Sequence, residues 1–419
     1  MIQNSDFILK TINGSSYLLP TGQSIADHKR GLRLNDTGIC IWEFLKTEHT
    51  SMEVVNHLLL RYGASGQEAE TIKKETLSFL QKLVNGGMLL CDMAVPTGPD
   101  GLWHTLSIAG LTFSLYGENN FFSPALLPFA TNTLFAFPDN AAPIKAADCG
   151  TSRQNVPDQT VLVLAGTPAT AGNGKVLLHN KELIVMERAD EYLFLFPDQP
   201  LLVEASLKKD ASFFCIYCIP SEKSSLQDVL FHVLRLGFLY LAQQRGMTVL
   251  HSASLLYKNK AYLFSGPSGT GKSTHTRLWQ EAFGTPLLNG DLNLLSFSEN
   301  TPLVHGIPWC GASGISTTSS HPLGGIVFLK QDTSDFVEEL SPDGQVLSLT
   351  NRMITPSWTP ALFEKNLFFA ERLASRTLLC RLHCTPTNHA AEMMKEYIDK
   401  QEEKNDMGRV GLEPTMFLL

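Results

Sequence analysis

The sequence predicts a mixed α/β protein built from more than one domain, and three observations support this class. The chain has 419 residues, more than one ordinary core accommodates, so two or three domains are expected. Short strands and helices come first, and a long run of β-type segments separated by polar turns follows. After residue 248, a strand, a glycine-rich loop and a helix succeed one another, which is the pattern of an α/β unit.

Residues 1–92 predict a small winged-helix-like domain. Its expected elements are strands FILKT, SYLLP and GLRLN, a helix through TGICIWEFLK, a helix after Thr50 and a helix over residues 70–84. Asn13-Gly14 is a strong hairpin signal between the first two strands. Thr50 and Glu53 have the spacing of a capping box, and Asn85-Gly86-Gly87 ends the last helix. AVPTGPDG, residues 94–101, has the composition of a linker.

The remaining chain divides into three further segments. Residues 102–222 contain many short β-type runs and no defensible catalytic pattern, so we expect a β-rich middle region. Residues 223–400 begin with one long helix ending at Gly246 and continue with strands TVLHSASLL and AYLFS. Residues 401–419 show no clear pattern and are expected to be disordered.

The glycine-rich loop matches G-x-x-x-x-G-K-[ST] between a strand candidate and a helix candidate. Glycines let successive backbone N–H groups point at phosphate oxygens, and the following helix N-terminus favours negative charge. Lys272 should reach the β- and γ-phosphates of a nucleotide such as ATP, and the Ser273 hydroxyl should bind Mg²⁺. The alternative is a glycine-rich turn without function. The expected nucleotide contacts are Gly266, Ser268, Gly269, Thr270, Gly271, Lys272, Ser273 and Thr274.

A triphosphate site also needs an acidic metal ligand, and Asp291 in TPLLNGDLNLL is the next candidate along the chain. Its setting at a strand end suits the role, although a plain turn aspartate after Asn289-Gly290 would look the same. His251 lies near the strand that leads toward the loop. A lone histidine is more often a core residue, so spacing alone does not assign it.

Together these segments resemble the HPr kinase/phosphorylase family and its phosphoenolpyruvate carboxykinase-like fold. The resemblance is carried by HSAS from His251, the loop, Leu288-Asn-Gly-Asp291, GIPWCG from Gly306 and PLGGIVFL from Pro322. It implies a histidine beside the catalytic metal, which makes His251 a third expected metal ligand and a catalytic residue with Lys272 and Asp291. The family usually shows two adjacent aspartates where this chain has Gly290-Asp291, so Asp291 covers both tasks with His251, or the base lies elsewhere. Ala312 stands where related kinases often carry a basic residue.

Residues 1–92 resemble the PqqD family, whose members grip the leader peptides of ribosomally made, modified peptides. The match is carried by the Asn13-Gly14 hairpin, LNDTGICIWEFL, the capped helix from Thr50 and FLQKLVNGGML. The resemblance implies that a leader adds as a strand along residues 31–34 and packs on the helix over 69–84. The alternative, a DNA-binding winged helix, is disfavoured by a net charge of −8 and by the lack of a basic recognition helix.

These resemblances imply an ATP- and Mg²⁺-dependent kinase acting on a serine or threonine of a precursor peptide or protein captured by the N-terminal domain. One alternative is a nucleotide-binding adaptor that presents the peptide without phosphoryl transfer. Another is a small-molecule enzyme of carboxykinase type. We expect no nucleic-acid partner, and the kinase relatives make a homo-oligomer an expectation.

The cysteines and the N-terminus bear on the compartment. Cys215 and Cys218 form one C-x-x-C, but in a strand positions i and i+3 face opposite ways, so a core role is expected over metal or redox chemistry. Cys380 and Cys384 flank His383 in another apolar run and are interpreted likewise. MIQNSDFILK lacks an apolar signal core, and polar residues interrupt the best membrane-like window, 226–242. The prediction is a reduced cytoplasmic protein outside the membrane.

Overall fold

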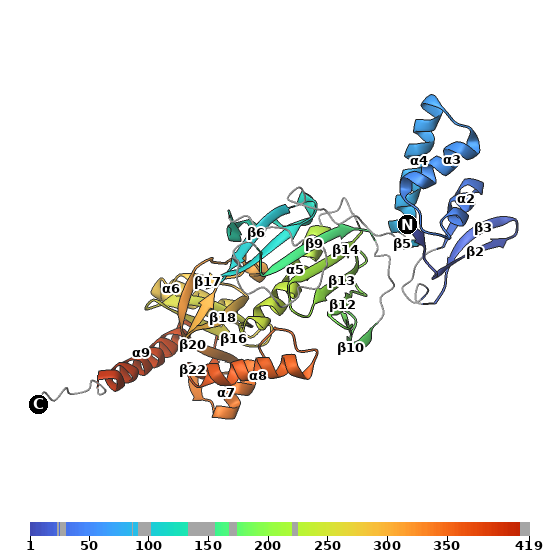
Figure 1. Ribbon diagram of the computed structural model, residues 1–419. Coiled ribbons are helices and arrows are strands. Elements are labelled where there is room, and N and C mark those ends of the chain that lie inside the picture. Colours follow the sequence, from blue (N-terminus) through green and yellow to red (C-terminus); the bar gives the residue numbers. More distant parts are fainter. Residues whose placement is uncertain are drawn as a thin grey trace, which may run out of the picture. The chain divides into compact units, whose positions relative to one another are not determined.

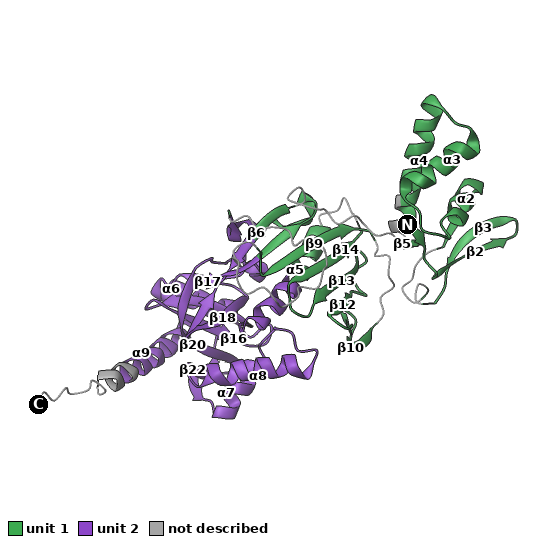
Figure 2. Ribbon diagram, viewed as in Figure 1, with its two compact units in different colours: residues 1–105, 113–123, 132–233 green, residues 106–112, 124–131, 234–419 purple. Residues whose placement is uncertain are grey.

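The computed structural model describes residues 1–22, 25, 31–85, 87–90, 102–132, 156–166, 174–219 and 225–410. Figure 1 shows a mixed α/β protein, as the sequence predicts. The chain forms two compact units, coloured in Figure 2. The first comprises residues 1–105, 113–123 and 132–233, and the second comprises residues 106–112, 124–131 and 234–419. The predicted linker 94–101 lies outside the described residues.

The described residues of the N-terminal domain, residues 1–90 of the first unit, form two small sheets and the helices α2 to α4. Its elements are β1 (Ile2–Gln3), β2 (Phe7–Ile12), β3 (Ser15–Pro20), β4 (Leu32–Leu34), α2 (Asp36–Phe44), α3 (Ser51–Tyr62), α4 (Gly66–Asn85) and β5 (Leu89–Leu90). One sheet has the order β2-β3-β4, and the other pairs β1 with β5. Asn13 and Gly14 both have positive φ, 49° and 78°, which makes the predicted hairpin turn.

Local hydrogen bonds set the starts of the helices in this domain. The Thr50 hydroxyl accepts from the Glu53 amide at 3.2 Å, and the Glu53 carboxylate accepts from the Thr50 amide at 2.7 Å. The predicted capping box is therefore confirmed. Asn35 likewise caps α2 by accepting from the Gly38 amide at 2.8 Å. Helix α4 begins at Gly66, earlier than predicted, because its first turn is polar and carries no apolar periodicity.

The middle of the chain forms a nine-stranded sheet, which confirms a β-rich region. Its strands are β6 (Leu102–Ile108), β7 (Leu111–Tyr116), β8 (Ala130–Thr131), β9 (Gln159–Ala165), β10 (Lys175–His179), β11 (Ile184–Glu187), β12 (Glu191–Leu195), β13 (Leu202–Lys208) and β14 (Phe213–Cys218). Their order is β10-β11-β12-β13-β14-β9-β7-β6-β8. The hairpins from β10 to β14 are antiparallel, whereas β9 is parallel to β14 and β7.

The second sheet carries the glycine-rich loop. Its strands are β15 (Thr248–Tyr257), β16 (Lys260–Ser265), β17 (Leu287–Asn289), β18 (Leu292–Ser298), β19 (Thr301–His305), β20 (Ser320–Gln331), β21 (Phe336–Glu339) and β22 (Leu378–Cys384). The order is β16-β15-β18-β19-β20-β22-β21, β17 pairs with β15, and β16 also pairs in parallel with β20. This extra pairing closes β16, β15, β18, β19 and β20 into a ring.

Helices α5 (Ser225–Gln244), α6 (Lys272–Phe283), α7 (Pro342–Thr350), α8 (Pro360–Ala374) and α9 (Asn388–Val410) complete this part of the chain. Two apolar cores lie on the sheet. One includes Phe369 and Leu373 of α8, and the other includes Trp279 of α6 and Met394 of α9. These two cores hold the strands that carry the loop between layers of helix.

Helix α9 corrects the prediction of a disordered tail over 401–419. It continues to Val410, and only residues 411–419 lie outside the described residues. The Glu402 carboxylate accepts from Lys260 at 2.8 Å and from the Tyr262 hydroxyl at 2.9 Å. The prediction was wrong for 401–410 because these contacts come from a strand far away in the sequence.

The four cysteines of the two apolar runs are free and buried, which confirms the core interpretation. Burial raises the pKa of the Cys215 and Cys218 thiols to about 12, so neither is a thiolate near neutral pH. Among the described residues, no helix combines the length and apolar character needed to cross a membrane.

Candidate functional site

The glycine-rich loop connects β16 to α6 as the sequence predicts. Gly269 and Gly271 have φ values of 78° and 98°, a region that residues with a side chain rarely adopt. At Gly266 a Cβ atom would lie 2.6 Å from the Thr270 hydroxyl and 3.2 Å from the Leu329 carbonyl oxygen. The glycines at these positions therefore permit both the backbone curl and the tight contact with β20.

Side-chain hydrogen bonds join the two ends of the loop to each other and attach the loop to the sheet. Lys272 donates to the carbonyl oxygens of Gly266 and Pro267 at 3.2 and 3.3 Å. Gln331, at the end of β20, donates to the Gly269 carbonyl oxygen at 3.0 Å. Ser268 and Ser273 are exposed, and Ser273 lies in the first turn of α6. The loop thus presents amides, one ammonium group and a hydroxyl, the groups that a phosphate chain and its cation use.

His251 and Asp291 meet beside this loop. His251 Nε2 lies 3.0 Å from Asp291 Oδ1, and about a third of each side chain is exposed. The pairing of strands brings them together, because His251 of β15 lies opposite Leu292 of β18. The Asp291 carbonyl oxygen also accepts from the Ser252 amide at 2.8 Å. Asp291 stands between β17 and β18, so it opens a strand rather than ending one.

The charges of this site are coupled. The hydrogen bond from His251 lowers the pKa of Asp291, burial opposes it, and the charges of His251, Lys272 and Arg235 lower it further. Burial lowers the pKa of Lys272, the charge of Asp291 opposes that shift, and Arg352 adds to it. These couplings link the lysine of the loop with Asp291.

Gly290 is held where no side chain fits. A Cβ atom there would lie 1.8 Å from Ser313 Oγ and 2.6 Å from Ser313 Cβ. Gly311 approaches from the same segment, since its Cβ would lie 2.9 Å from Asp291 Cβ. A second aspartate at position 290 therefore cannot coexist with this packing of residues 310–314.

A buried polar network behind Asp291 escaped the sequence analysis. Asn293 donates to the Ser252 carbonyl oxygen at 2.6 Å and accepts from the Ser254 hydroxyl at 2.7 Å and from the Asn289 amide group at 3.1 Å. All four side chains are buried. The network ties β17 and β18 to β15 on both sides of Asp291. Serines and asparagines in strands are a weak sequence signal, because such residues are also common in turns.

The sequence analysis also did not assign two arginines to this site. The charge of Arg235, on α5, acts on Asp291, and the charge of Arg352, which follows α7, acts on Lys272. Arg235 lies in an amphipathic helix and Arg352 in a turn, and in such segments an arginine usually indicates a surface position. Among the described residues, no group of three or more His, Cys, Asp and Glu side chains could hold a metal ion without a further ligand. An Mg²⁺ site here would draw on Ser273, Asp291 and nucleotide oxygens, which suits a cation that prefers oxygen ligands.

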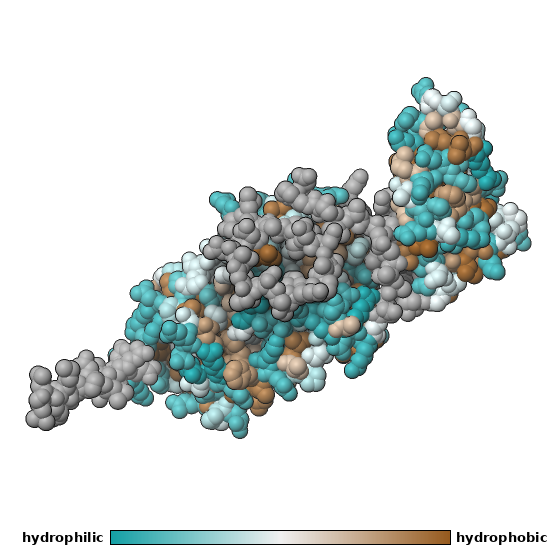
Figure 3. Space-filling view, viewed as in Figure 1, coloured by the Kyte–Doolittle hydropathy of each residue, from teal (hydrophilic) through white to brown (hydrophobic). Residues whose placement is uncertain are grey.

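The N-terminal domain contains a groove of about 830 Å³. Its walls are β4, from Leu32 to Leu34, and one face of α4 that includes Ile72 and Phe79. In the part of the domain that the structure describes, β4 is at the edge of its sheet and pairs with β3. The groove therefore follows the edge and the helix along which the sequence analysis expected a leader peptide. Figure 3 shows apolar patches among the polar surface of this domain, which exposes Met52, Leu60 and Leu77.

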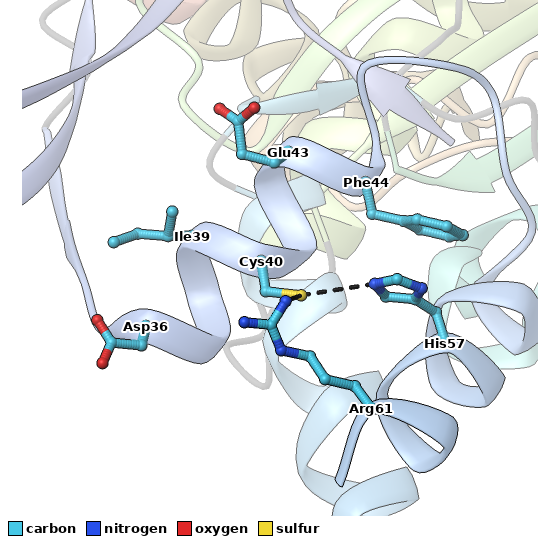
Figure 4. Close-up of a pocket in the computed structure, with 7 residues that line it drawn as sticks. All are labelled: Asp36, Ile39, Cys40, Glu43, Phe44, His57 and Arg61. Atoms are coloured by element: carbon cyan, nitrogen blue, oxygen red, sulfur yellow. Dashed lines mark hydrogen bonds between the residues drawn. The ribbon is translucent and has the colours of Figure 1, made fainter.

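A second cavity of about 530 Å³ lies between α2 and α3 of the same domain (Figure 4). Cys40 Sγ accepts from Arg61 at 3.0 Å and lies 3.6 Å from His57 Nε2. Phe44 stacks on His57 with ring centroids 4.1 Å apart. These contacts hold the thiol in a polar wall of the cavity, with Asp36 and Glu43 also lining it.

The family of coenzyme PQQ synthesis protein D (PqqD) matches residues 23–89, so this part of the chain is a PqqD domain. No curated protein matches the chain. The solved structures similar to it include the Hpr(Ser) kinase/phosphatase from Coxiella burnetii, with 12% identity and a TM-score of 0.22 over 37% of this chain and 98% of that one.

Proposed function

We propose that the protein is an ATP- and Mg²⁺-dependent kinase that phosphorylates a serine or threonine of a peptide gripped by its PqqD domain. The observation that carries the proposal is the His251–Asp291 pair beside a complete phosphate loop. The loop alone supports nucleotide binding. A carboxylate and an imidazole beside Lys272 add what a hydroxyl acceptor needs, namely a group that takes its proton.

The roles follow from the geometry. Lys272 and the loop amides stabilise the negative charge of the phosphoryl group during transfer. The acceptor hydroxyl loses its proton to Asp291 or His251 while its oxygen bonds to phosphorus and the bond from phosphorus to the leaving ADP oxygen breaks. Magnesium, when bound by Ser273 and Asp291, neutralises charge on the phosphate oxygens. His251 Nε2 is already hydrogen-bonded to Asp291 Oδ1, which supports a role in orienting the carboxylate rather than in binding Mg²⁺ directly.

The peptide partner is supported by the PqqD domain and its groove. An extended peptide would add to the free edge of β4 and place apolar side chains against Ile72 and Phe79. Tethering through a leader raises the effective concentration of the acceptor segment, so the kinase site need not bind that segment tightly. Modification of a peptide is consistent with the involvement of PqqD in coenzyme PQQ synthesis.

One observation favours a second candidate, a nucleotide-binding adaptor that presents the peptide without phosphoryl transfer. The HPr kinase/phosphorylase family usually carries a second aspartate at the position of Gly290, and the packing around Gly290 leaves no room for it. If the remaining His251–Asp291 pair cannot serve as base, nucleotide binding would be left without transfer.

Intact-mass spectrometry separates the two candidates. A peptide that binds the PqqD domain and contains serine and threonine residues is incubated with the protein, Mg²⁺ and ATP. A kinase adds the mass of one phosphoryl group, and Lys272→Ala lowers the rate about 100-fold or more because a stabilising charge is lost. Lys365→Ala, an exposed lysine of α8, is the matched control and should leave the rate unchanged.

Asp291→Asn sharpens the same experiment. It should abolish most transfer, because an amide is not a base and is a poor Mg²⁺ ligand, yet leave peptide binding intact. Peptide bound normally without any mass gain in the wild-type protein would overturn the kinase and support the adaptor.

A further inference from the structure

The site beside the loop holds more positive charge than its own carboxylate balances. Among the described residues, Asp291 is the acid whose charge acts on Lys272. Two further cations act here, Arg235 on Asp291 and Arg352 on Lys272. This concentration stands out in a chain whose net charge is −8. Cations gathered in one place without matching acids attract an anion.

Packing places Arg235 near Asp291. One turn after Arg235 on α5, the Phe238 ring lies 5.2 Å from the Trp309 ring. Trp309 belongs to the segment that continues to Gly311, and Gly311 packs directly against Asp291. Helix α5 is thus held on the segment that borders the carboxylate. Burial lowers the pKa of Arg235, and the charge of Asp291 opposes this shift.

Backbone pairing places Arg352 next to His251. The His251 amide donates to the Arg352 carbonyl oxygen at 2.9 Å. The neighbouring residues Leu250 and Met353 form an antiparallel bridge. The backbone of Arg352 is therefore hydrogen-bonded to the strand that carries His251, and the charge of Arg352 lowers the pKa of Lys272.

Neither guanidinium group has a hydrogen bond or an ion pair with any residue in the described part of the chain. Both are partly buried. A guanidinium group has five N–H donors arranged to bind two oxygens of a phosphate at once. Partly buried donors without protein acceptors are suited to an anionic ligand that arrives with the nucleotide.

We propose that Arg235 and Arg352 bind the terminal phosphate of a nucleoside triphosphate, and so make the site prefer a triphosphate to a diphosphate. This rests on the proposed nucleotide site and adds residues that hold the group to be transferred. The β-phosphate lies at the loop amides and Lys272. The terminal phosphate then lies on the side of His251 and Asp291, between the two arginines.

Calorimetric titration with two probes tests this without any peptide. The probes are ADP and the non-hydrolysable triphosphate adenylyl imidodiphosphate, each with Mg²⁺. We expect Arg235→Gln and Arg352→Gln each to weaken triphosphate binding about tenfold or more, since each removes charged hydrogen bonds, and to change ADP binding less than twofold. Arg277→Gln is the matched control, because Arg277 is exposed on α6 and pairs with Glu281.

The outcomes separate this inference from the proposed function. If the wild-type protein and Lys272→Ala both fail to bind either nucleotide, the nucleotide site itself is wrong. If the wild type binds nucleotides and the arginine variants keep its triphosphate preference, the assignment of the arginines is overturned. An equal loss of both nucleotides would also overturn it, and the thermal melting of each variant shows whether such a loss reflects unfolding. Arg352→Lys, which keeps the charge, supports the assignment if it recovers part of the triphosphate affinity.

Discussion

The PqqD domain and the phosphate-loop region differ in how far apart in the sequence the residues of their candidate sites lie. The groove of the PqqD domain is built from neighbours in sequence, since β4 and α4 lie within residues 32–85. The loop region instead assembles its site from Arg235, His251, Lys272, Asp291 and Arg352, five residues on different segments. Recognition of an extended peptide needs an edge and an apolar wall. The proposed phosphoryl transfer needs charges held at defined distances, and strands and helices from distant parts of the chain supply them together.

The difference appears in how each region tolerates change. A groove of about 830 Å³ with an open edge can accept different side chains. The site beside the loop has no such freedom at Gly290 and Gly311, where a single Cβ would overlap Ser313 or Asp291. We therefore expect small changes to be costly beside the loop and local in the PqqD domain.

Gly290→Ala tests the close packing beside the phosphate loop and has the largest expected effect on stability. The added methyl group would meet Ser313 Oγ at 1.8 Å, so residues 310–314 must move, at a cost of about 3 kcal/mol in the free energy of unfolding. Urea unfolding of the isolated variant measures it. In a Ser313→Gly background the same substitution should cost much less, and an equal cost in both backgrounds would contradict the clash.

Ile72→Glu tests the groove of the PqqD domain. A charged side chain in the apolar wall of the groove should weaken peptide binding by about 2 kcal/mol, roughly 30-fold, because the groove loses an anchor contact. Fluorescence anisotropy with the labelled leader measures the affinity.

Leu60→Glu is the matched control for the groove variant, since Leu60 is 85% exposed on α3 and does not line the groove. Nucleotide affinity should be the same in both variants and the wild type. A loss of nucleotide binding in Ile72→Glu would break the separation of the two regions.

Thr50→Ala has the smallest expected effect and probes the local character of the PqqD domain. It removes the hydroxyl that accepts from the Glu53 amide, and such caps contribute about 1 kcal/mol to stability. Chemical unfolding of the N-terminal transition measures the change, and Ser51→Ala, the next residue, should leave it nearly unchanged. Transfer of a phosphoryl group to a saturating peptide should not respond to Thr50→Ala.

The sequence analysis was most accurate where neighbours in the chain decide the structure. The Asn13-Gly14 hairpin, the Thr50 capping box and the strand–loop–helix around Gly266 all follow from local rules. It was wrong for 401–410, because the anchors of α9 are Lys260 and Tyr262, far away in the sequence. Arg235 and Arg352 escaped it for the same reason, since neither lies in a motif.

The amino-acid sequence by itself therefore determined the loop, the hairpin and the capping box, because short-range sterics and hydrogen bonding decide these features. The expected catalytic roles of His251 and Asp291 came instead from a family resemblance. Only the tertiary structure decided that His251 Nε2 lies 3.0 Å from Asp291 Oδ1, that Gly290 has no room for a side chain, and that the charges of Arg235 and Arg352 act on Asp291 and Lys272. The physical reason is that strand pairing and side-chain packing join segments far apart in the chain, and no local pattern encodes which of them will touch.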